Sequence, residues 1–471
     1  MSDTERSPES VLIDHAMAVD YDGLDPALRR HVRDLIFDTL AIGIGAAVGN
    51  HASGRITEDY AVSLGGRSEA MLWSGKGAVT AEQAALVNGT LAEILDYQDT
   101  VIHPRNAGHL AVTIVPAALA VAEAVGADAR LLGSAVAAGI DVGVSVLAAV
   151  GTRHRRDGRG FRTTALSGPI GAAVACARLL GLDHHKTLMA LGIAAAAAPK
   201  GLMTSLGGGT AEFAMDKDLQ NGLCAEMGVV AARLAERGMT GASRAVTGDN
   251  GFLASHAEGD ALPLLPPAPG DSFVRYPCLK GHPACYGALA AVEATLQLRA
   301  EGIPPIADIE AVRVHIKDVS AVTLNVYSIP NDMAARFSIP YCVASTLIRG
   351  HLQTSDFSEA ALADQAVLAL MPRVEVVASP ELSKVYREEG LFAGEVELIA
   401  GNQSWRPRVM DPPGSFANPL GPERLRKKFS EMVDGTWSVE RQDALLSAFE
   451  DFDGIDVRRL IAPVKLEAEA A

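Results

Sequence analysis

The chain has 471 residues, of which 48% are apolar and only 5% aromatic, and its 41 basic and 57 acidic residues give a formal net charge of −16. A chain of this length exceeds one compact core, so two domains are expected. The acidic balance argues against nucleic acid and against an anionic membrane surface as partners, although a few local cations suffice to bind an anionic substrate.

Helix signals follow one another through the first 250 residues. Asp25 is an N-cap before Pro26, a residue that favours the first helical position. Thr80 and Gln83 form a capping box, which opens a helix that ends near Tyr97. Further helices are expected over 113–125, 128–150, 168–180, 183–198 and 220–237. No strand is expected in this part of the chain.

The character of the sequence changes after about residue 262, where a proline-rich stretch over 263–270 marks a linker. Residues 311–319 alternate between apolar and polar side chains and predict a half-buried strand. Two more strands are expected over 373–378 and 395–399, and helices over about 333–350 and 358–370. From Pro422 the pattern is helical again.

These elements predict a mainly α fold with two domains. Residues 1–265 form a large all-helical domain that residues 405–471 complete, and residues 270–404 form a smaller α+β domain. The low aromatic content and the abundance of Ala and Gly suit closely packed helices.

Composition also predicts the cell compartment. The five cysteines form no Cys-x-x-Cys pair, which predicts reduced thiols in the cytoplasm and no zinc site. The first ten residues are polar and contain three acids, which is not typical of a signal peptide. The most apolar long run, 131–150, is interrupted by Asp141, which favours a buried helix over a membrane span.

The most informative segment is Asp96-Tyr97-Gln98-Asp99-Thr100, followed by His103 and His109. Titratable groups at such a junction between helices cannot all be buried at low cost. They are either solvated or line a cleft in which they take part in chemistry. A carboxylate at the end of a helix meets the unfavourable end of the helix dipole, so Asp96 needs a partner.

The two imidazoles are natural general bases because histidine titrates near neutral pH. His109 is the better candidate, since it precedes an apolar helix and would be partly desolvated. A metal site made of Asp99, His103 and His109 matches no known zinc spacing.

A second polar segment, Asp216-Lys217-Asp218, follows Gly207-Gly208-Gly209 and could face the first across a pocket. The glycines permit close approach of the backbone to a ligand, but no Gly-Lys-Ser/Thr sequence follows, so this is not a phosphate-binding loop. A simple ion cluster on the surface is the alternative for Lys217.

Arg275, Lys280 and His282 place three basic side chains within eight residues at the start of the second domain. In an acidic protein this cluster suggests a wall that binds carboxylates. The chain has no Gly-x-Ser-x-Gly elbow and no dinucleotide fingerprint. Proton-transfer chemistry without a bound cofactor is therefore the economical interpretation.

Five segments in this order resemble the MmgE/PrpD family, and the similarity covers nearly the whole chain. The segments are Leu95 to Thr100; His109 with Pro116 to Ala120; Gly160-Phe161 with Gly168 and Ala177 to Gly181; Lys217 with Gly222 and Ala231-Ala232; and Ala335 to Tyr341. The family includes 2-methylcitrate dehydratase, cis-aconitate decarboxylase and iminodisuccinate epimerase.

The resemblance implies a homodimer, with an active site between the two domains of the chain. It assigns Asp96, Thr100, His109 and Lys217 to the active site. His109 is chosen over His103 because the loop here is longer than is usual in the family. His282 is added as a further candidate base. The expected substrate-binding residues are Arg162, Arg275, Lys280 and Tyr341.

Three positions depart from the family pattern. Arg162 stands where the family usually has His, Val274 where Lys is common, and Asn221 where His is usual. An Arg at 162 would hold a carboxylate through a bidentate fork. Arg275 and Lys280 are the two candidates to replace the missing lysine.

The sequence therefore predicts a cofactor-independent lyase, a dehydratase or decarboxylase that acts on a small di- or tricarboxylate. Its base, His109 or Lys217, would transfer a proton at a carbon next to a carboxylate. An epimerase with two opposed bases, His109 with either His282 or Lys217, is the first alternative. A non-catalytic helical dimer that binds a metabolite or a protein is the second.

Overall fold

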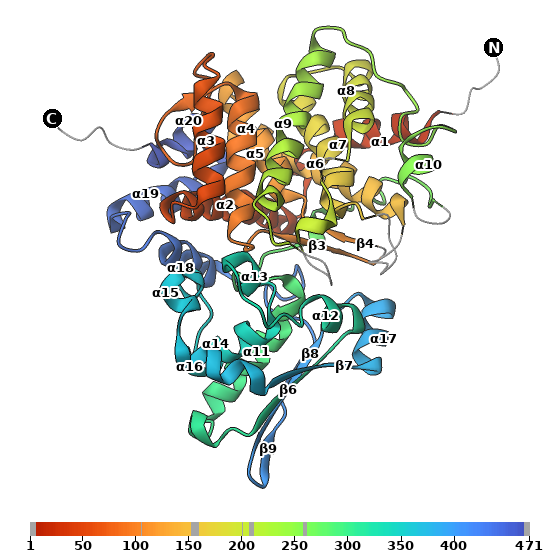
Figure 1. Cartoon of the computed structure of the whole chain (residues 1–471). Coiled ribbons are helices and arrows are strands. Elements are labelled where there is room, and N and C mark those ends of the chain that lie inside the picture. Colours follow the sequence, from red (N-terminus) through yellow and green to blue (C-terminus); the bar gives the residue numbers. More distant parts are fainter. Residues whose placement is uncertain are drawn as a thin grey trace, which may run out of the picture.

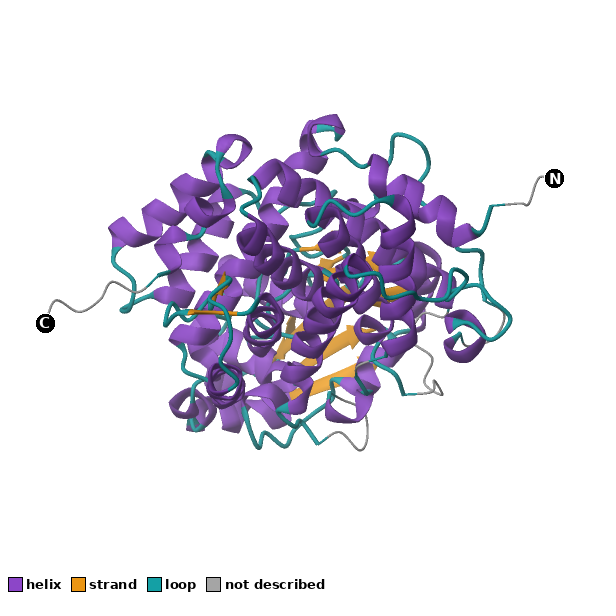
Figure 2. Ribbon diagram, turned by 90° about the horizontal axis from the view of Figure 1, so that it is seen from above, coloured by secondary structure: helices purple, strands orange, loops and turns teal. Residues whose placement is uncertain are grey.

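The computed structural model describes residues 6–104, 106–151, 160–199, 201–206, 212–257 and 261–465. Figure 1 shows a large helical domain above a smaller domain that is built around a sheet. The prediction of a mainly α fold with a smaller α+β domain is confirmed. Seen from above in Figure 2, helices surround the few strands on all sides.

Among the described residues, the helical domain consists of ten helices between residues 8 and 256 and three near the C-terminal end. The first ten are α1 (Pro8–Ala18), α2 (Pro26–Val48), α3 (Ala52–Ser63), α4 (Ala81–Ile94), α5 (Ala111–Val125), α6 (Ala129–Val150), α7 (Thr163–Leu179), α8 (His184–Ala197), α9 (Asp216–Glu236) and α10 (Phe252–His256). The last three are α18 (Pro422–Val433), α19 (Val439–Glu450) and α20 (Val457–Leu460). Side chains of the last three, such as Phe429 and Leu445, join the same hydrophobic core as α2 and α4.

Several helix boundaries follow the local signals in the sequence. Thr80 and Gln83 make the capping box of α4, and Gly126 ends α5 in the left-handed conformation at φ 69°. Two helices begin earlier than predicted. α7 begins at Thr163 instead of Gly168, and α9 begins at Asp216 instead of Gln220. The acids in the first turn of α9 suit the positive end of the helix dipole.

α6 is long and apolar enough to cross a membrane by length and composition alone, but 89% of its most apolar window is buried inside the protein. It packs along α5 and α7 in the middle of the helical domain. A buried core helix has the same composition as a membrane span, so burial decides between the two.

Helices α4 and α9 cross at a pair of glycines. A Cβ on Gly222 would lie 2.2 Å from the carbonyl oxygen of Leu86, and a Cβ on Gly89 would lie 3.0 Å from Cα of Gly222. The backbones therefore touch at this point, which only glycine permits. The last turn of α4 and the first turn of α9 consequently lie side by side.

The smaller domain surrounds a five-stranded sheet. Four strands have the order β10-β8-β6-β7, and the fifth, β9, pairs with residues 398–400 of β8. The strands are β6 (Ala311–Ile316), β7 (Val374–Ala378), β8 (Gly394–Ala400), β9 (Gln403–Trp405) and β10 (Arg408–Val409). β6 runs parallel to β7 and antiparallel to β8. The helices are α11 (Tyr286–Glu301), α12 (Asp318–Thr323), α13 (Asp332–Arg336), α14 (Ile339–Arg349), α15 (Glu359–Leu362), α16 (Gln365–Leu370) and α17 (Pro380–Glu389).

The three strands predicted here are present, but two predicted helices are each broken in two. Ser338 ends the segment of α13 and caps α14, where Pro340 lies in the first turn. Asp364 caps α16 after the short α15. Each break occurs where a side chain accepts a hydrogen bond from the backbone of the next helix.

The expectation of no strand in the first 250 residues is wrong. β1 (Ala70–Met71) pairs with β2 (Ala78–Val79), and β3 (Thr100–His103) lies between β4 (Asn106–Gly108) and β5 (Pro277–Cys278). These strands have two to four residues, too few for an alternating pattern to show in the sequence.

Candidate active site

The small sheet around β3 assembles the candidate site. β3 begins at Thr100, directly after the Asp96 segment, and pairs with β5 so that Thr100 is opposite Cys278. On its other side Val101 is opposite Gly108, which precedes His109. Both pairings are antiparallel. The pairing of β3 with β5 brings together segments that are more than 170 residues apart in the chain.

Asp96 lies at the end of α4 in a left-handed backbone conformation, with φ 48°. Lys280 Nζ donates to the backbone oxygen of Asp96 at 2.7 Å and lies 3.3 Å from its Oδ1. Lys217 Nζ lies 3.7 Å from the same Oδ1. Burial alone would raise the pKa of Asp96, but Lys280 and Lys217 outweigh it and hold the pKa below its ordinary value. Asp96 is therefore a carboxylate with two ammonium partners.

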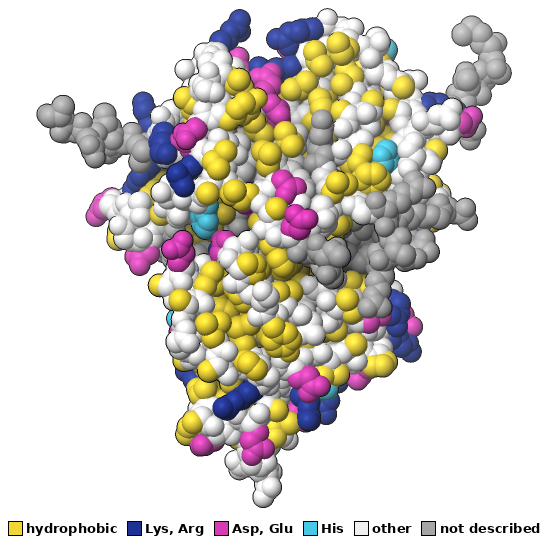
Figure 3. Space-filling view, in the orientation of Figure 1, with side chains coloured by type: hydrophobic (Ala, Val, Ile, Leu, Met, Phe, Trp, Pro, Cys, Tyr) yellow, Lys and Arg dark blue, Asp and Glu magenta, His cyan; other side chains and the backbone are white. Residues whose placement is uncertain are grey.

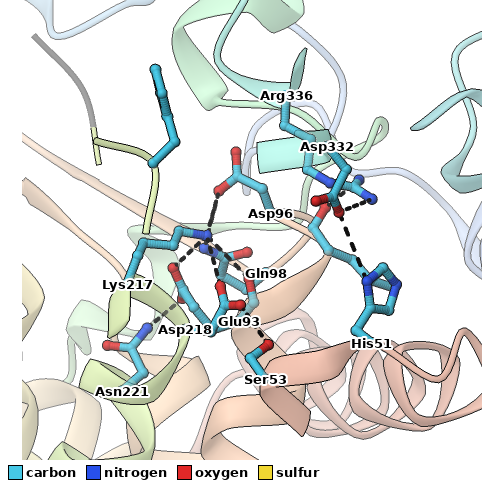
Figure 4. Close-up of polar contacts among 12 residues, drawn as sticks. His51, Ser53, Glu93, Asp96, Gln98, Lys217, Asp218, Asn221, Asp332 and Arg336 are labelled. Carbon is cyan, nitrogen blue, oxygen red and sulfur yellow. Dashed lines mark hydrogen bonds and ion pairs between the residues drawn. The ribbon is translucent and has the colours of Figure 1, made fainter. Parts of the chain in front are cut away.

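Glu93, one turn earlier on α4, is fully buried and is the centre of a polar network (Figure 4). Its Oε1 lies 2.9 Å from Lys217 Nζ and accepts a hydrogen bond from Arg162, while its Oε2 accepts one from Asn221. Despite burial, Arg162 and Lys217 keep the pKa of Glu93 below its ordinary value. The glycine crossing of α4 and α9 is what brings these groups within reach.

Lys217 is only 1% exposed, so it is not part of a surface ion cluster. Burial disfavours its charge, but Glu93, Asp96 and Asp218 reverse the effect and raise its pKa above the ordinary value. Figure 4 shows its amine between these three carboxylates. Lys217 is consequently an ammonium ion at neutral pH and can act as an acid or a cation.

His109 has the opposite character. Its Nδ1 lies 2.5 Å from the backbone oxygen of Asp99 and 3.3 Å from Thr100 Oγ1. A carbonyl can only accept, so Nδ1 carries the hydrogen and Nε2 keeps its lone pair. Burial and the nearby Lys280 lower the pKa of His109 to about 4. The ring is therefore neutral at physiological pH, as a general base must be.

The carboxyl of Asp99 binds the backbone at the start of α5 rather than the imidazole of His109. Its oxygens accept from the backbone N–H groups of Leu110 and Val112 at 3.1 and 3.2 Å. Burial raises its pKa to about 7, even though these hydrogen bonds favour the charged form. The backbone of Asp99 orients the imidazole, and its side chain fixes the helix that follows.

A cavity of about 160 Å³ lies between the two domains. Its wall on the helical domain is polar and includes Asp96, Thr100, His109, Arg162 and Thr164. Its wall on the smaller domain is mostly apolar and includes Tyr286, Val319, Leu324, Phe337 and Phe392, together with Lys317. Lys280 also lines the cavity. Figure 3 shows acidic and basic side chains interspersed on the outer face, whereas the cations of this site are buried.

Comparison with known proteins agrees with this architecture. Residues 10–264 match the model of the MmgE/PrpD N-terminal domain, and residues 282–453 match that of the MmgE/PrpD C-terminal domain. The chain belongs to the MmgE/PrpD family.

Curated relatives span most of the chain at low identity. Cis-aconitate decarboxylase of Mus musculus is 23% identical over 97% of this chain and 93% of its own length. The Homo sapiens enzyme of the same name is 25% identical over 79% of this chain and 77% of its own length. The cis-aconitate decarboxylase-like protein oryM of Aspergillus oryzae is 24% identical over 82% of this chain and 83% of its own length. These matches support an enzyme of the dehydratase or decarboxylase type, a lyase in general terms.

The structure places two of the three departures from the MmgE/PrpD pattern at one carboxylate. Arg162 and Asn221 both donate to Glu93, one to each oxygen. Val274 is fully buried in the hydrophobic core, and the neighbouring Arg275 is paired with Asp271 and half-buried. Of the two candidates to replace the missing lysine, Lys280 lines the cavity and Arg275 does not.

Four predicted site residues do not line this cavity. Lys217 is buried against Glu93 and Asp96, the second of which lines the cavity. His282 lines a separate cavity of about 500 Å³, where its Nε2 is 3.1 Å from Glu293. The guanidinium carbon of Arg275 lies 5.7 Å from the ring centroid of Phe416, and Arg275 does not line the cavity. Tyr341 is fully buried, and its hydroxyl donates to the backbone oxygen of Asp356 at 2.5 Å, so its role in this structure is packing.

Sequence reasoning missed two residues of the site. Glu93 is in the middle of an apolar helix pattern, where nothing local indicates a buried carboxylate hub. Lys317 follows β6, and its amine lies 3.3 Å from the ring centroid of Tyr386 and 3.4 Å from that of Phe392. Within the described residues no group of three or more His, Cys, Asp or Glu side chains could hold a metal ion. The glycine run 207–209 lies outside the described residues.

Proposed function

We propose that this protein is a cofactor-independent lyase that eliminates water or CO2 from a small di- or tricarboxylate. The observation that carries the proposal is the pairing of one neutral imidazole, His109, with the ammonium groups of Lys217 and Lys280 around Asp96. A base that is ready at neutral pH beside fixed cations suits proton transfer at a carbon next to a carboxylate.

Polar groups of the cavity that lack partners would bind the substrate. Oδ2 of Asp96 and Nε of Arg162 are buried and have no hydrogen-bond partner among the described residues. Asp96 can accept from a substrate hydroxyl or carboxyl group, and Arg162 can donate to a carboxylate. Lys280 on one wall and Lys317 on the other would each bind a carboxylate, which fits a substrate with at least two.

In a dehydration, His109 Nε2 removes the proton next to a carboxylate, and the electron pair forms the C=C bond as hydroxide leaves. The leaving oxygen takes a proton from the Lys217 ammonium. In a decarboxylation, the C–C bond breaks, CO2 departs, and the carbon that gains the electron pair is protonated by the same ammonium. Both routes concentrate charge on a carboxylate that Lys280 stabilises.

The names of the relatives favour the second route, and cis-aconitate is the first substrate to test. Purified protein, treated with a chelator, would be incubated in D2O with a panel of di- and tricarboxylates and followed by NMR. Loss of CO2 with deuterium incorporated at the carbon that gains the electron pair, or loss of water to give a C=C bond, supports the proposal. Deuterium incorporation without loss of any group would point to epimerisation instead.

Lys217→Ala is expected to abolish turnover while the thermal melting curve stays cooperative. Turnover retained in this variant would remove Lys217 from the mechanism. The matched control is Lys427→Ala, which removes a lysine from α18 that is 73% exposed; it is expected to keep full activity.

The two other functions have less support. An epimerase based on His109 and His282 needs both rings in one cavity, but they line different ones. An epimerase based on His109 and Lys217 could use the neutral imidazole as base and the ammonium as acid in one direction, but the reverse direction needs a neutral amine, which the three carboxylate neighbours of Lys217 oppose. The non-catalytic alternative expects Asp96 and Lys217 to be far apart or exposed, but they are buried and 3.7 Å apart.

The homodimer and the cytoplasmic location remain proposals from the resemblance and from composition. Light scattering on the purified chain tests the first, and a mass near twice 49.2 kDa is expected. Fractionation of the source cells tests the second.

A further inference from the structure

The end of α4 is held by cations from four distant parts of the chain. The backbone oxygens of Glu93, Leu95, Asp96 and Tyr97 accept from Lys217 at 3.2 Å, Arg336 at 2.8 Å, Lys280 at 2.7 Å and Lys428 at 3.1 Å, respectively. The last carbonyls of a helix lack intrahelical partners and carry the negative end of its dipole, so cations are their natural ligands.

Lys428 differs from the other three because it lines the separate cavity of about 500 Å³, whereas Lys280 lines the catalytic cavity and Lys217 and Arg336 line neither. It comes from α18, close to the end of the described chain, and is 3% exposed. Its ammonium has three N–H donors, and three oxygens lie within reach of them. These are Asp38 Oδ1 at 2.7 Å, the backbone oxygen of Tyr97 at 3.1 Å and the backbone oxygen of Lys280 at 3.1 Å. It therefore bonds to both segments that carry the Asp96–Lys280 ion pair.

The contact is reinforced by the side chain of Tyr97. Its ring lies 3.8 Å from Lys428 Nζ, and its hydroxyl donates to the backbone oxygen of Gly281 at 3.0 Å. The loop after α4 and the loop after β5 are thus connected twice, beside a residue, Asp96, whose backbone is in the left-handed region. A non-glycine residue in this region persists only where the surroundings hold it.

We infer that Lys428 is a positioning residue: it sets the geometry of Asp96 and Lys280 by holding the backbones of Tyr97 and Lys280 together. This inference rests on the proposed function for its kinetic consequences, although its structural consequence is independent of any activity. Misplacement of catalytic groups by about 1 Å can cost about 10²-fold in rate.

The test must separate positioning from stability, because Lys428→Met alone leaves Asp38 buried without its cation. The double variant Asp38→Asn with Lys428→Met removes the stranded charge but still lacks the donor to the two carbonyls. Leu425→Ala, on the same helix, is the control for lost packing. Its Tm is expected to fall while kcat stays within about twofold of the wild-type value, since a leucine side chain has no donor for either carbonyl.

The first readout is amide hydrogen exchange. The double variant is expected to exchange faster over 95–101 and 278–283, and the control is expected not to. The second readout is kinetic: kcat of the double variant should fall about 10- to 100-fold with KM changed less. The third is rescue. Lys428 borders the cavity of about 500 Å³, so propylammonium is expected to restore part of kcat in Lys428→Ala.

Unchanged exchange over both segments in the double variant would overturn the inference, whatever the activity. Normal kcat in the double variant would overturn it as well. If the wild-type protein turns over none of the carboxylates tested, the proposed function fails, and the exchange measurement alone decides whether Lys428 positions the two segments.

Discussion

Lys217 Nζ lies 2.9 Å from Oε1 of Glu93, and neither side chain is more than 1% exposed. Arg162 donates to the same oxygen, so two cations share this carboxylate in the interior. Removing one partner of a buried ionic group leaves an uncompensated charge, which is far more costly than the absence of the whole group. Glu93 therefore determines the charge state of the site without facing the substrate cavity.

Glu93→Gln is expected to lower the free energy of unfolding by about 3–5 kcal/mol, because Arg162 loses its counter-charge and Lys217 loses the nearest of its three carboxylates. Urea denaturation measures the loss. Glu82→Gln is the matched control: Glu82 pairs with Arg233 at 3.0 Å, but both side chains are partly exposed. Its expected cost is about 0–1 kcal/mol. Equal losses in both variants would contradict the role of Glu93.

Lys280→Met is expected to lower kcat/KM at least about 100-fold, since it removes an ammonium from Asp96 and from the cavity wall. Arg275→Met is its counterpart, because Arg275 pairs with Asp271 outside the cavity. This second variant should keep wild-type kinetics. The comparison identifies which of the two basic residues replaces the lysine missing at Val274, and the reverse outcome would assign that role to Arg275.

The pH dependence of kcat/KM is expected to show an acid limb near pH 4, because the pKa of His109 is lowered to about 4. Below this pH the imidazole gains a proton and is no longer a base, so the rate falls about tenfold per pH unit. Asp99→Asn is the control for the nearby carboxyl, whose pKa is about 7. The acid limb should persist in this variant. A limb that moves with Asp99 would mean that the imidazole is not the titrating group.

Glu123 offers a test of stability away from the site. Burial raises its pKa to about 8 from the ordinary 4.5, although the backbone N–H of Met71 donates to it. A carboxyl whose pKa is higher in the folded state contributes stability that is fully present below the unfolded pKa and is lost as pH rises through the folded one. The wild-type free energy of unfolding should thus fall between about pH 5 and pH 8, with a slope of up to about 1.4 kcal/mol for each pH unit.

Glu123→Gln keeps an acceptor for Met71 and cannot ionise. Its free energy of unfolding, measured by urea denaturation across the same range, should lack most of this fall. The variant would then gain stability relative to the wild type as pH increases. Parallel curves for the two proteins would show that Glu123 does not titrate in this window.

Local signals predicted the helical framework well. Asp25 with Pro26, Thr80 with Gln83, and Gly126 act within one turn of the chain, so the sequence alone locates those helix ends. The assembly of the site was harder to predict. Asp96 meets Lys280 only because β3 pairs with β5, and strands this short show no periodicity.

The remaining misses have a common cause. Glu93, Lys317 and Lys428 are ordinary charged residues in their local sequence, and burial by distant segments gives each of them its role. His282 and Arg275 were grouped with Lys280 because all three lie within eight residues. The chain turns between them, so only one of the three side chains reaches the cavity.

The division of the cavity into a polar wall and an apolar wall has a consequence for engineering. The groups proposed to move protons belong to the helical domain, whereas Tyr286, Leu324 and Phe392 belong to the smaller one. Enlarging or reshaping these three side chains would alter which carbon skeletons are accepted and leave the acid–base apparatus untouched. New substrate preferences are therefore best sought by randomising the smaller domain alone.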